Sequence, residues 1–338
     1  MKISIIIKAL NEEHNIARCL RSALAAVEAV DGGGEVILAD SLSSDRTVDI
    51  AREFPVRIVQ LTRAEDRCCG VGADLGYRVA VGEFLYILDA DMTLSPDFLP
   101  VALREFDRDP GLAGVGGRIK EMHIDNAEFR GRASQKLAHF EPGPVDRLNM
   151  GGLYRRAAVD ALGYLTNRNL HSFEEYELAA RLRASGWSLR RIDVLAAQHY
   201  GHTDSSMRML LRRWRSRYAW GLGELLRESV GHPHLPLVLR EVRLVRQCLA
   251  VYLWWGSALV AAIAWSVGFA SGWLVAAVGL LPLIVTSVKR RSLNDGLYVL
   301  VFNNMYALGL LAGVLSKQRG RPEEAPPTRL CGSGDGQG

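Results

Sequence analysis

The chain of 338 residues is too long for one small domain, and it carries 41 basic residues against 37 acidic ones. This near balance excludes the strong positive charge that is typical of nucleic-acid-binding proteins, so no nucleic-acid partner is expected. The five cysteines form no C-x-x-C pair and no zinc spacing, as is typical of free thiols in a reducing compartment. Length and composition therefore predict a cytosolic catalytic domain of ordinary size with an appendage.

The N-terminal half alternates short β-branched runs with longer segments that carry apolar residues at helical spacing. Such alternation predicts an α/β fold in which helices cover both faces of a doubly wound, mostly parallel sheet. The first run is far shorter than the apolar core of a signal peptide and ends at Lys8, so the first domain is expected in the cytosol. The predicted strands are Ile3–Ile7, Val36–Ala39, Val56–Gln60 and Phe84–Leu88.

Acidic side chains follow these strands at the sheet edge where ligands of parallel sheets bind. Asp89 and Asp91 follow the fourth run, and Mg²⁺ or Mn²⁺ is typically held by one or two carboxylates together with substrate phosphates. A D-x-D pair can also be a turn into the next helix, but its place after a strand favours a metal site. Asp40 ends the second run, where a carboxylate can accept the imide N–H of a uracil or contact a guanine edge.

Further polar residues follow in the second half of the domain. Glu174 and Glu175 begin the predicted helix Phe173–Ser185, and acids at a helix start also stabilise it through the helix dipole. Both therefore have a structural explanation beside a catalytic one. His199 and His202 follow a strand-like run, and either imidazole can supply a metal ligand. His199 is preferred because it follows the run most directly.

Six motifs in a fixed order resemble those of family 2 glycosyltransferases of the GT-A fold, over roughly residues 1–220. The motifs are Ala9–Glu13, Asp40–Thr47, Gly72–Gly76, Asp89–Asp91, Gly151–Gly152 and Phe173–Leu178. The resemblance implies a nucleotide-sugar donor, with a UDP-sugar as the first expectation, and a divalent metal, Mg²⁺ or Mn²⁺. Lys8 stands where proline is common in that family.

The resemblance also implies roles for individual residues. Glu175 matches the general base that takes the proton of an acceptor hydroxyl, and Gly151, Gly152 and Glu174 match the acceptor side. The implied metal ligands are Asp89, Asp91 and His199. The implied donor-binding residues are Ala9, Asn11, Glu12, Asp40, Arg67 and Asp89.

A base on the acceptor side favours a single displacement, so the product is expected to have inverted anomeric configuration. The expected acceptor is a hydroxyl of a glycan or lipid-linked saccharide, as in the assembly of cell-surface polysaccharide or exopolysaccharide. Transfer to a polyprenyl phosphate is the alternative, although a phosphate is already a nucleophile and needs no base.

Two functions of other classes are disfavoured by the sequence. A non-catalytic membrane scaffold with a relic GT-A domain would be expected to have lost an acidic site residue, and none is lost. A nicotinamide oxidoreductase would need its glycine motif directly after a buried strand, whereas Gly70–Gly76 follows a polar segment.

The C-terminal part is strongly apolar. Leu249–Val288 contains no charged residue and is long enough for two helices of about twenty residues across a bilayer. Gly268–Gly272 is the expected turn, and Lys289–Arg291 favours the cytosolic side of the membrane. Leu297–Leu315 is long enough for a third span, but the basic cluster at Lys317–Arg321 argues against a third full crossing.

These patterns predict three parts. The first is a GT-A domain at 1–235, whose segment at about 205–235 interleaves cations with aromatic residues as in helices at anionic membrane surfaces. Membrane-anchoring helices at 236–318 and a disordered tail at 319–338 complete the chain. The expected location is the cytoplasmic membrane, which the chain is expected to cross more than once. The catalytic domain is expected in the cytosol, and membrane lipid is an expected partner.

Overall fold

The computed structural model describes residues 1–122, 140–201 and 206–331. The chain divides into two compact units, the first formed by 1–203 with 318–338 and the second by 204–317. The sequence predicted a domain boundary near residue 235, whereas the short helices that begin at residue 206 pack with the long apolar helices in the second unit.

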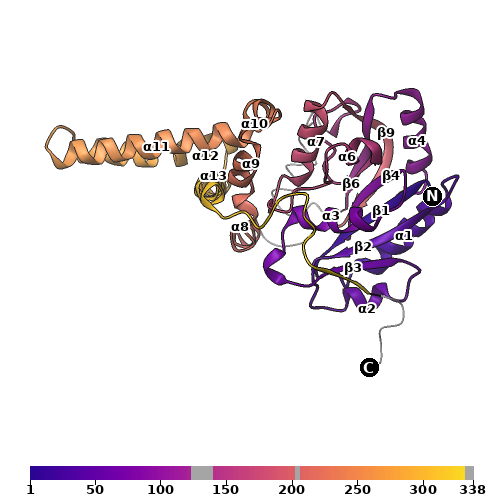
Figure 1. Ribbon diagram of the computed structural model, residues 1–338. Coiled ribbons are helices and arrows are strands. Elements are labelled where there is room, and N and C mark those ends of the chain that lie inside the picture. The colour runs from indigo at the N-terminus through magenta and orange to yellow at the C-terminus, as the bar shows by residue number, and fades with distance from the viewer. Residues whose placement is uncertain (123–139, 202–205, 332–338) are drawn as a thin grey trace. The chain divides into compact units, whose positions relative to one another are not determined.

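A mixed sheet forms the centre of the first unit (Figure 1). The neighbouring strands β3, β2, β1 and β4 run parallel, and β8 joins β4 antiparallel. The strand order is β10-β3-β2-β1-β4-β8-β6-β9-β5, with β7 paired to β9. The strands are β1 (Ile3–Ala9), β2 (Gly34–Asp40), β3 (Arg57–Leu61), β4 (Phe84–Asp89), β5 (Met92–Leu94), β6 (Leu112–Glu121), β7 (Gly143–Pro144), β8 (Gly152–Arg155), β9 (Ser188–His199) and β10 (Thr328–Cys331).

Helices cover both faces of this sheet. Ile3, Ile5 and Ile7 of β1 face the core that α1, α2 and α4 close, whereas Ile6 faces the core closed by α3, α6 and α7. Both faces are buried, as expected for parallel strands with helical crossovers, so the predicted doubly wound sheet is confirmed. The helices are α1 (Ile16–Glu28), α2 (Thr47–Ala51), η1 (Ala64–Asp66), α3 (Cys69–Val79), α4 (Phe98–Arg108), α6 (Arg156–Asp160) and α7 (Glu174–Ala184).

The segment after residue 317 also belongs to the first unit. Strand β10 pairs antiparallel with β3, and Thr62 N donates to Pro327 O at 3.1 Å. The sequence predicted a disordered tail from residue 319, whereas in the structure this segment pairs at Thr328–Cys331 with the backbone of the free edge of β3. The remaining part of the expected tail, 332–338, lies outside the described residues.

The second unit is helical. Its helices α11, α12 and α13 are long and apolar enough to cross a membrane, by length and composition. The turn between α11 and α12 falls at Gly268–Gly272, as predicted. The helices are α8 (Ser206–Arg215), η3 (Tyr218–Trp220), α9 (Gly221–Ser229), α10 (Leu235–Glu241), α11 (Arg243–Ser266), α12 (Gly272–Arg290) and α13 (Leu293–Leu315).

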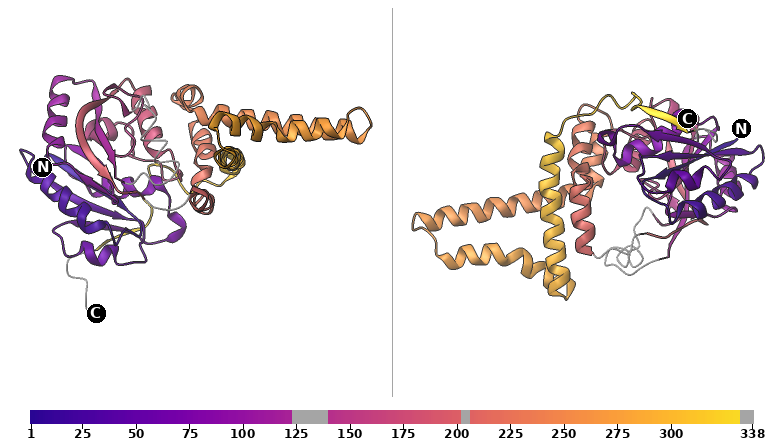
Figure 2. Two further views of the ribbon diagram at one scale, coloured as in Figure 1. Left: turned by 180° about the vertical axis from the view of Figure 1, so that it is seen from behind. Right: turned by 90° about the horizontal axis from the view of Figure 1, so that it is seen from below.

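Helix α13 runs across the hairpin that α11 and α12 form. In the right-hand view of Figure 2 the hairpin helices lie side by side and α13 crosses them, and Figure 1 looks along the α13 axis. An added Cβ on Gly309 would lie 2.2 Å from Ala219 O, and one on Gly313 would lie 2.1 Å from Trp220 O. Glycines thus allow α13 to contact the backbone of η3, as small residues do between membrane helices.

The asparagine in the middle of α13 has polar partners. Trp255 Nε1 donates to Asn304 Oδ1 at 2.9 Å, and Asn304 Nδ2 donates to Leu300 O at 2.8 Å. A buried or lipid-facing amide is costly unless it is hydrogen-bonded, so these contacts explain how an apolar helix accommodates it.

Candidate active site

The candidate site lies at the carboxyl ends of the central strands. In the sheet register, Lys8 of β1 is the partner of Asp89 of β4, and Ala9 is the partner of Asp40 at the end of β2. The register therefore brings three segments that are far apart in the sequence to one edge, where ligands of parallel sheets bind.

Left-handed backbone conformations mark this edge. Asn11, Leu42, Met150 and Phe173 have φ angles between 57° and 67°. Such angles are uncommon for residues with a side chain and are retained where the surroundings fix them, frequently at functional sites. Each of the four lies within two residues of a predicted site residue; the other described non-glycine residues with positive φ are Arg217 and Arg291.

Lys8 lies among three carboxylates. Its Nζ is 2.9 Å from Asp89 Oδ1, 3.2 Å from Glu175 Oε1 and 3.6 Å from Glu174 Oε1. Gly72 leaves room for the lysine stem, since an added Cβ there would lie 3.3 Å from Lys8 Cγ. Burial lowers the pKa of Lys8, but the three carboxylates outweigh it and hold the pKa above its usual range. Lys8 is therefore a cation at neutral pH.

The carboxyl group of Glu175 is buried and oriented. Its Oε2 accepts from Met150 N at 2.9 Å, and its side chain is 11% exposed. Burial raises the pKa of Glu175 to about 7, against the lowering effect of Lys8. Because a base works best when its pKa lies near the operating pH, this carboxyl is suited to proton transfer at neutral pH.

The three metal ligands expected from the sequence do not all contact one another. Asp89 contacts Lys8, whereas Asp91 Oδ2 lies 3.2 Å from His199 Nε2. His199 Nδ1 lies 2.6 Å from Glu121 Oε2. Burial lowers the pKa of His199, but hydrogen bonds with Asp91 and Glu121 raise it to about 10.

The pairing of β5 with β9 sets this geometry. Met92 is the register partner of His199, and Tyr200 N donates to Asp91 O at 3.0 Å. Glu121 ends β6 and is the register partner of His199 on the other side. The imidazole is therefore fixed between two carboxylates, one in the turn between β4 and β5 and one at the end of β6.

A divalent cation fits beside these side chains if it displaces the proton that His199 Nε2 shares with Asp91, because an imidazole binds a metal in its neutral form. A substrate would supply further ligands to that cation. No group of three or more His, Cys, Asp or Glu side chains forms a metal site within the described ranges. The Asp91 carboxylate and the His199 imidazole are nevertheless in contact, and Mg²⁺ or Mn²⁺ commonly takes its other ligands from phosphates and water. Burial and repulsion from Asp91 and Asp89 raise the pKa of Glu12 to about 7, so this edge has an excess of negative charge that a cation relieves.

Two of the predicted donor-binding residues, Asp40 and Arg67, form hydrogen bonds that stabilise the turn after β2. Asp40 is fully buried, and its Oδ2 accepts from Ser43 N at 2.9 Å and from Gln60 Nε2 at 2.7 Å. Arg67 Nε donates to Ser41 O at 2.9 Å, and its guanidinium also bonds the next carbonyl. The turn that carries Asp40 is therefore held from several sides.

The loop after β1 packs on the loop after β2. Asn11 Oδ1 accepts from Ser44 N at 2.8 Å, and Glu12 N donates to Thr47 Oγ1 at 2.8 Å. These bonds bring Asn11 and Glu12 beside the Asp40 turn.

The two glycines expected on the acceptor side lie in tight surroundings, and Gly151 also has a backbone conformation that favours glycine. Gly151 has a φ of 101°, and an added Cβ there would lie 3.0 Å from Tyr86 Oη. A Cβ on Gly152 would lie 3.0 Å from Leu148 Cβ. The glycines follow Met150, whose N–H binds Glu175, so this loop lies directly beside the candidate base.

The sequence analysis missed two members of the site. Lys8 was recognised only as the end of an apolar run and as a departure from the family pattern, and no role was predicted for Glu121. Glu121 carries a weaker signal than Asp40 and Asp89, since it also ends a strand but the three residues before it are not buried. The alternative histidine, His202, lies outside the described residues.

Comparison with known proteins gives consistent matches. The model of the family described as "Glycosyl transferase family 2" matches residues 4–161. A Methanococcus voltae protein named dolichyl N-acetyl-alpha-D-glucosaminyl phosphate 3-beta-D-2,3-diacetamido-2,3-dideoxy-beta-D-glucuronosyltransferase is 30% identical over 67% of this chain and 74% of its own length. An undecaprenyl-phosphate 4-deoxy-4-formamido-L-arabinose transferase of Sodalis glossinidius is 30% identical over 50% of this chain and 53% of its own length.

The chain spans about half or less of the length of the first curated relatives that it matches. Among solved structures, the mannosyltransferase PcManGT of Pyrobaculum calidifontis, in complex with GDP-Man and Mn²⁺, superimposes with a TM-score of 0.61. It is 18% identical, and the match covers 91% of this chain and 87% of that one. This likeness shows a shared fold and confirms the expected GT-A architecture.

Proposed function

Because the chain belongs to glycosyl transferase family 2, we propose that it transfers a sugar from a nucleotide-sugar donor to a hydroxyl group with inversion at the anomeric carbon. The observation that carries this proposal is the buried carboxyl of Glu175, with a pKa of about 7 and a fixed place between Lys8 and the loop before Gly151. A relic domain in a scaffold would have no use for such a group.

The proposed step is a single displacement. The acceptor oxygen forms a bond to the anomeric carbon while the bond from that carbon to the diphosphate oxygen breaks. The acceptor hydroxyl proton passes to a Glu175 oxygen, and the electron pair of the broken bond leaves with the diphosphate. Lys8 holds Glu175 in place during this transfer.

The proposed donor is a nucleoside diphosphate sugar, with a UDP-sugar as the first expectation. Asp40 and the turn it stabilises are proposed to contact the base, together with Ala9, Asn11, Glu12 and Arg67. Asp91 and His199 are proposed to hold a divalent metal, with Asp89 facing the same diphosphate. When bound, that metal would neutralise the charge of the leaving diphosphate. PcManGT, which shares the fold, was solved in complex with GDP-Man and Mn²⁺, and this supports a nucleotide-sugar donor and a divalent metal for the proposal.

The proposed acceptor is a saccharide hydroxyl, on a glycan or on a lipid-linked saccharide. The name of the Methanococcus voltae relative describes a dolichyl N-acetylglucosaminyl phosphate as the substrate, which is a lipid-linked saccharide. Transfer to a polyprenyl phosphate is the second candidate, because the Sodalis glossinidius relative is named for undecaprenyl phosphate. That reaction would need no base.

Membrane anchoring is proposed to use the α11–α12 hairpin. Strand β10 pairs with β3, so the segment that follows α13 lies on the same side of the membrane as the sheet. An even number of crossings satisfies this condition, and three do not. The hairpin supplies two crossings, and α13, which runs across the hairpin, is proposed to lie along the cytosolic membrane surface (Figure 2).

The test is donor consumption by the purified full chain. A panel of UDP- and GDP-sugars is incubated with Mn²⁺ and a lipid-linked saccharide, and the configuration of the product is read by NMR. Inverted product formed from one donor is the expected result. Retained configuration, or turnover only with a polyprenyl phosphate, would contradict the hydroxyl-transfer proposal.

A further inference from the structure

We propose that the C-terminal segment 318–331 is part of the donor site and that Arg319 and Arg329 are positioning residues for the turn after Asp40. This inference rests on the proposed function, since it takes Asp40 as the residue that contacts the nucleotide base. The segment follows the last long helix, yet it belongs to the first unit and contacts the elements that brace that turn.

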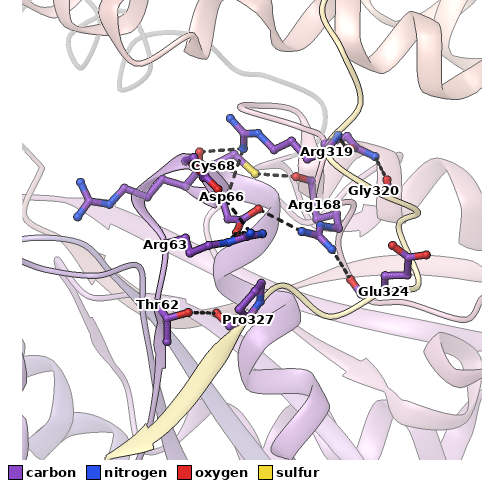
Figure 3. A network of polar contacts seen from close by, with 12 residues as sticks. Thr62, Arg63, Asp66, Cys68, Arg168, Arg319, Gly320, Glu324 and Pro327 are labelled. Atoms are coloured by element: carbon purple, nitrogen blue, oxygen red, sulfur yellow. Dashed lines mark hydrogen bonds and ion pairs between the residues drawn. The ribbon is translucent and has the colours of Figure 1, made fainter.

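Hydrogen bonds from the rest of the first unit hold the segment at several points along its length (Figure 3). Asn169 binds its beginning at two points, since Arg319 N donates to Asn169 Oδ1 at 2.8 Å and Asn169 Nδ2 donates to Gly320 O at 2.9 Å. Further along, Arg168 Nη1 donates to Glu324 O at 3.0 Å. Each bond engages a backbone group of the segment, so its path is fixed independently of its side chains.

Arg319 braces the donor turn through Arg67. Arg319 Nη1 donates to Arg67 O at 2.9 Å, and its other terminal nitrogen lies 2.7 Å from His171 Nε2. Arg67 in turn donates to the carbonyls of Ser41 and Leu42. A backbone shift at Arg67 would therefore move the guanidinium that holds the turn.

Arg329 braces the same turn through Gln60. In the register of three adjacent strands, Arg329 of β10 is the partner of Gln60 of β3, and Gln60 is the partner of Asp40 of β2. Arg329 Nε donates to Gln60 Oε1 at 2.8 Å, and Gln60 Nε2 donates to Asp40 Oδ2 at 2.7 Å. A row of polar side chains thus connects the last strand of the chain to the predicted base-binding carboxylate.

The donor and acceptor groups in this row allow only one direction of hydrogen bonding. A carboxylate can only accept hydrogen bonds and a guanidinium can only donate them, so the amide between them must present its nitrogen to Asp40 and its oxygen to Arg329. Gln60 and Asp40 are both buried, where an unmatched polar atom is costly. Arg329 therefore fixes the orientation of the amide and, through it, the position of the Asp40 carboxylate.

The test measures donor affinity in the full-length protein. Arg329→Ala and Arg319→Ala are compared with Arg321→Ala, which removes the same charge from an exposed position of the same segment. The binding of UDP and of GDP with Mn²⁺ is measured by calorimetry, alongside kcat, KM for the donor and thermal stability. Loss of these partly exposed hydrogen bonds should weaken nucleotide binding and raise the donor KM by about three- to tenfold, with kcat within about twofold.

A double-mutant cycle tests whether Arg329 acts on Asp40 through Gln60. If Arg329 acts through Gln60, Arg329→Ala should add nothing to the effect of Gln60→Ala, and Arg329→Lys should restore part of the affinity. Wild-type affinity in both arginine variants, an equal effect of Arg321→Ala, or additive effects in the cycle would overturn the inference. A wild-type chain that binds neither nucleotide would instead refute the proposed function, so the two failures are distinguishable.

Discussion

At the scale of single residues, Lys8 acts on the pKa of Glu175. Its ammonium group lowers the pKa of Glu175, which burial raises to about 7. A base acts in its ionised form, so kcat/KM should increase with pH through the pKa of Glu175. Lys8→Met removes the lowering effect and should move this acidic limb to higher pH. A pH profile of kcat/KM measures the shift, and an unmoved limb would show that the two side chains are not coupled in the working enzyme.

Glu175 itself can be tested with a neighbour as control. General-base assistance is typically worth about a hundredfold to ten-thousandfold in rate, so Glu175→Gln should lower kcat by that order and abolish the acidic limb. Donor binding should barely change. Glu174→Gln is the matched control, because Glu174 also begins α7 and lies near Lys8, at 3.6 Å. Near-normal turnover of Glu175→Gln would place the base elsewhere or indicate a phosphate acceptor.

Asp91 offers a readout that does not depend on turnover. Asp91→Asn removes a carboxylate ligand and should abolish the Mn²⁺-dependent part of nucleotide binding, as measured by calorimetry. It should also lower the pKa of His199, which Asp91 helps to raise to about 10, and NMR of the imidazole can follow that change. Asp193→Asn, which changes an exposed aspartate paired with Arg118, is the control. Unchanged Mn²⁺ dependence in Asp91→Asn would remove Asp91 from the metal site.

The sequence indicated the acidic members of this site because each one follows a strand or begins a helix. Asp40, Asp89, Asp91 and Glu175 all satisfy that local rule. Their partners could not be found in this way, because an ion pair such as Lys8 with Glu175 joins positions 167 residues apart. Such contacts depend on strand order and register, which local patterns do not contain.

At the scale of elements, the buried strands were predictable and the edge strand was not. The predicted β1 to β4 agree with the structure to within about two residues because continuous β-branched runs are typical of strands buried on both faces. Strand β10 comes from a segment rich in proline and glycine, and it pairs through its backbone with a free edge. Backbone pairing leaves little trace in hydropathy, so composition alone predicted disorder.

The glycines of α13 give a prediction about helix packing. Gly313→Ala would put a Cβ 2.1 Å from Trp220 O, and overpacking of this kind typically costs about 1–3 kcal/mol. Gly279→Ala in α12 is the matched control, because no atom lies within 4 Å of the added Cβ and alanine favours a helix. Thermal unfolding in detergent should therefore show a lower midpoint for Gly313→Ala only. Equal midpoints would mean that α13 does not pack on η3.

At the scale of the whole molecule, chain connectivity restricts the membrane topology. The second unit begins after residue 203 and ends at residue 317, and the chain on both sides of it belongs to the first unit. A folded sheet cannot be divided by a bilayer, so in the proposed topology the chain enters and leaves the membrane on the same side. The proposed topology follows from strand pairing and connectivity alone, and it agrees with the basic residues after α12 and α13, which favour the cytosolic side.

Thiol labelling in oriented vesicles tests this topology. A cysteine in place of Phe269, which is 89% exposed in the α11–α12 turn, should react with an impermeant maleimide from the outer face. A cysteine in place of Leu330, 62% exposed on β10, should react only from the cytosolic face. The wild-type chain reports the background from native thiols, and an alkaline wash should leave both variants in the membrane fraction. Labelling of both positions from the outer face would mean that α13 is a third crossing and that β10 does not pair with β3 in the membrane-bound protein.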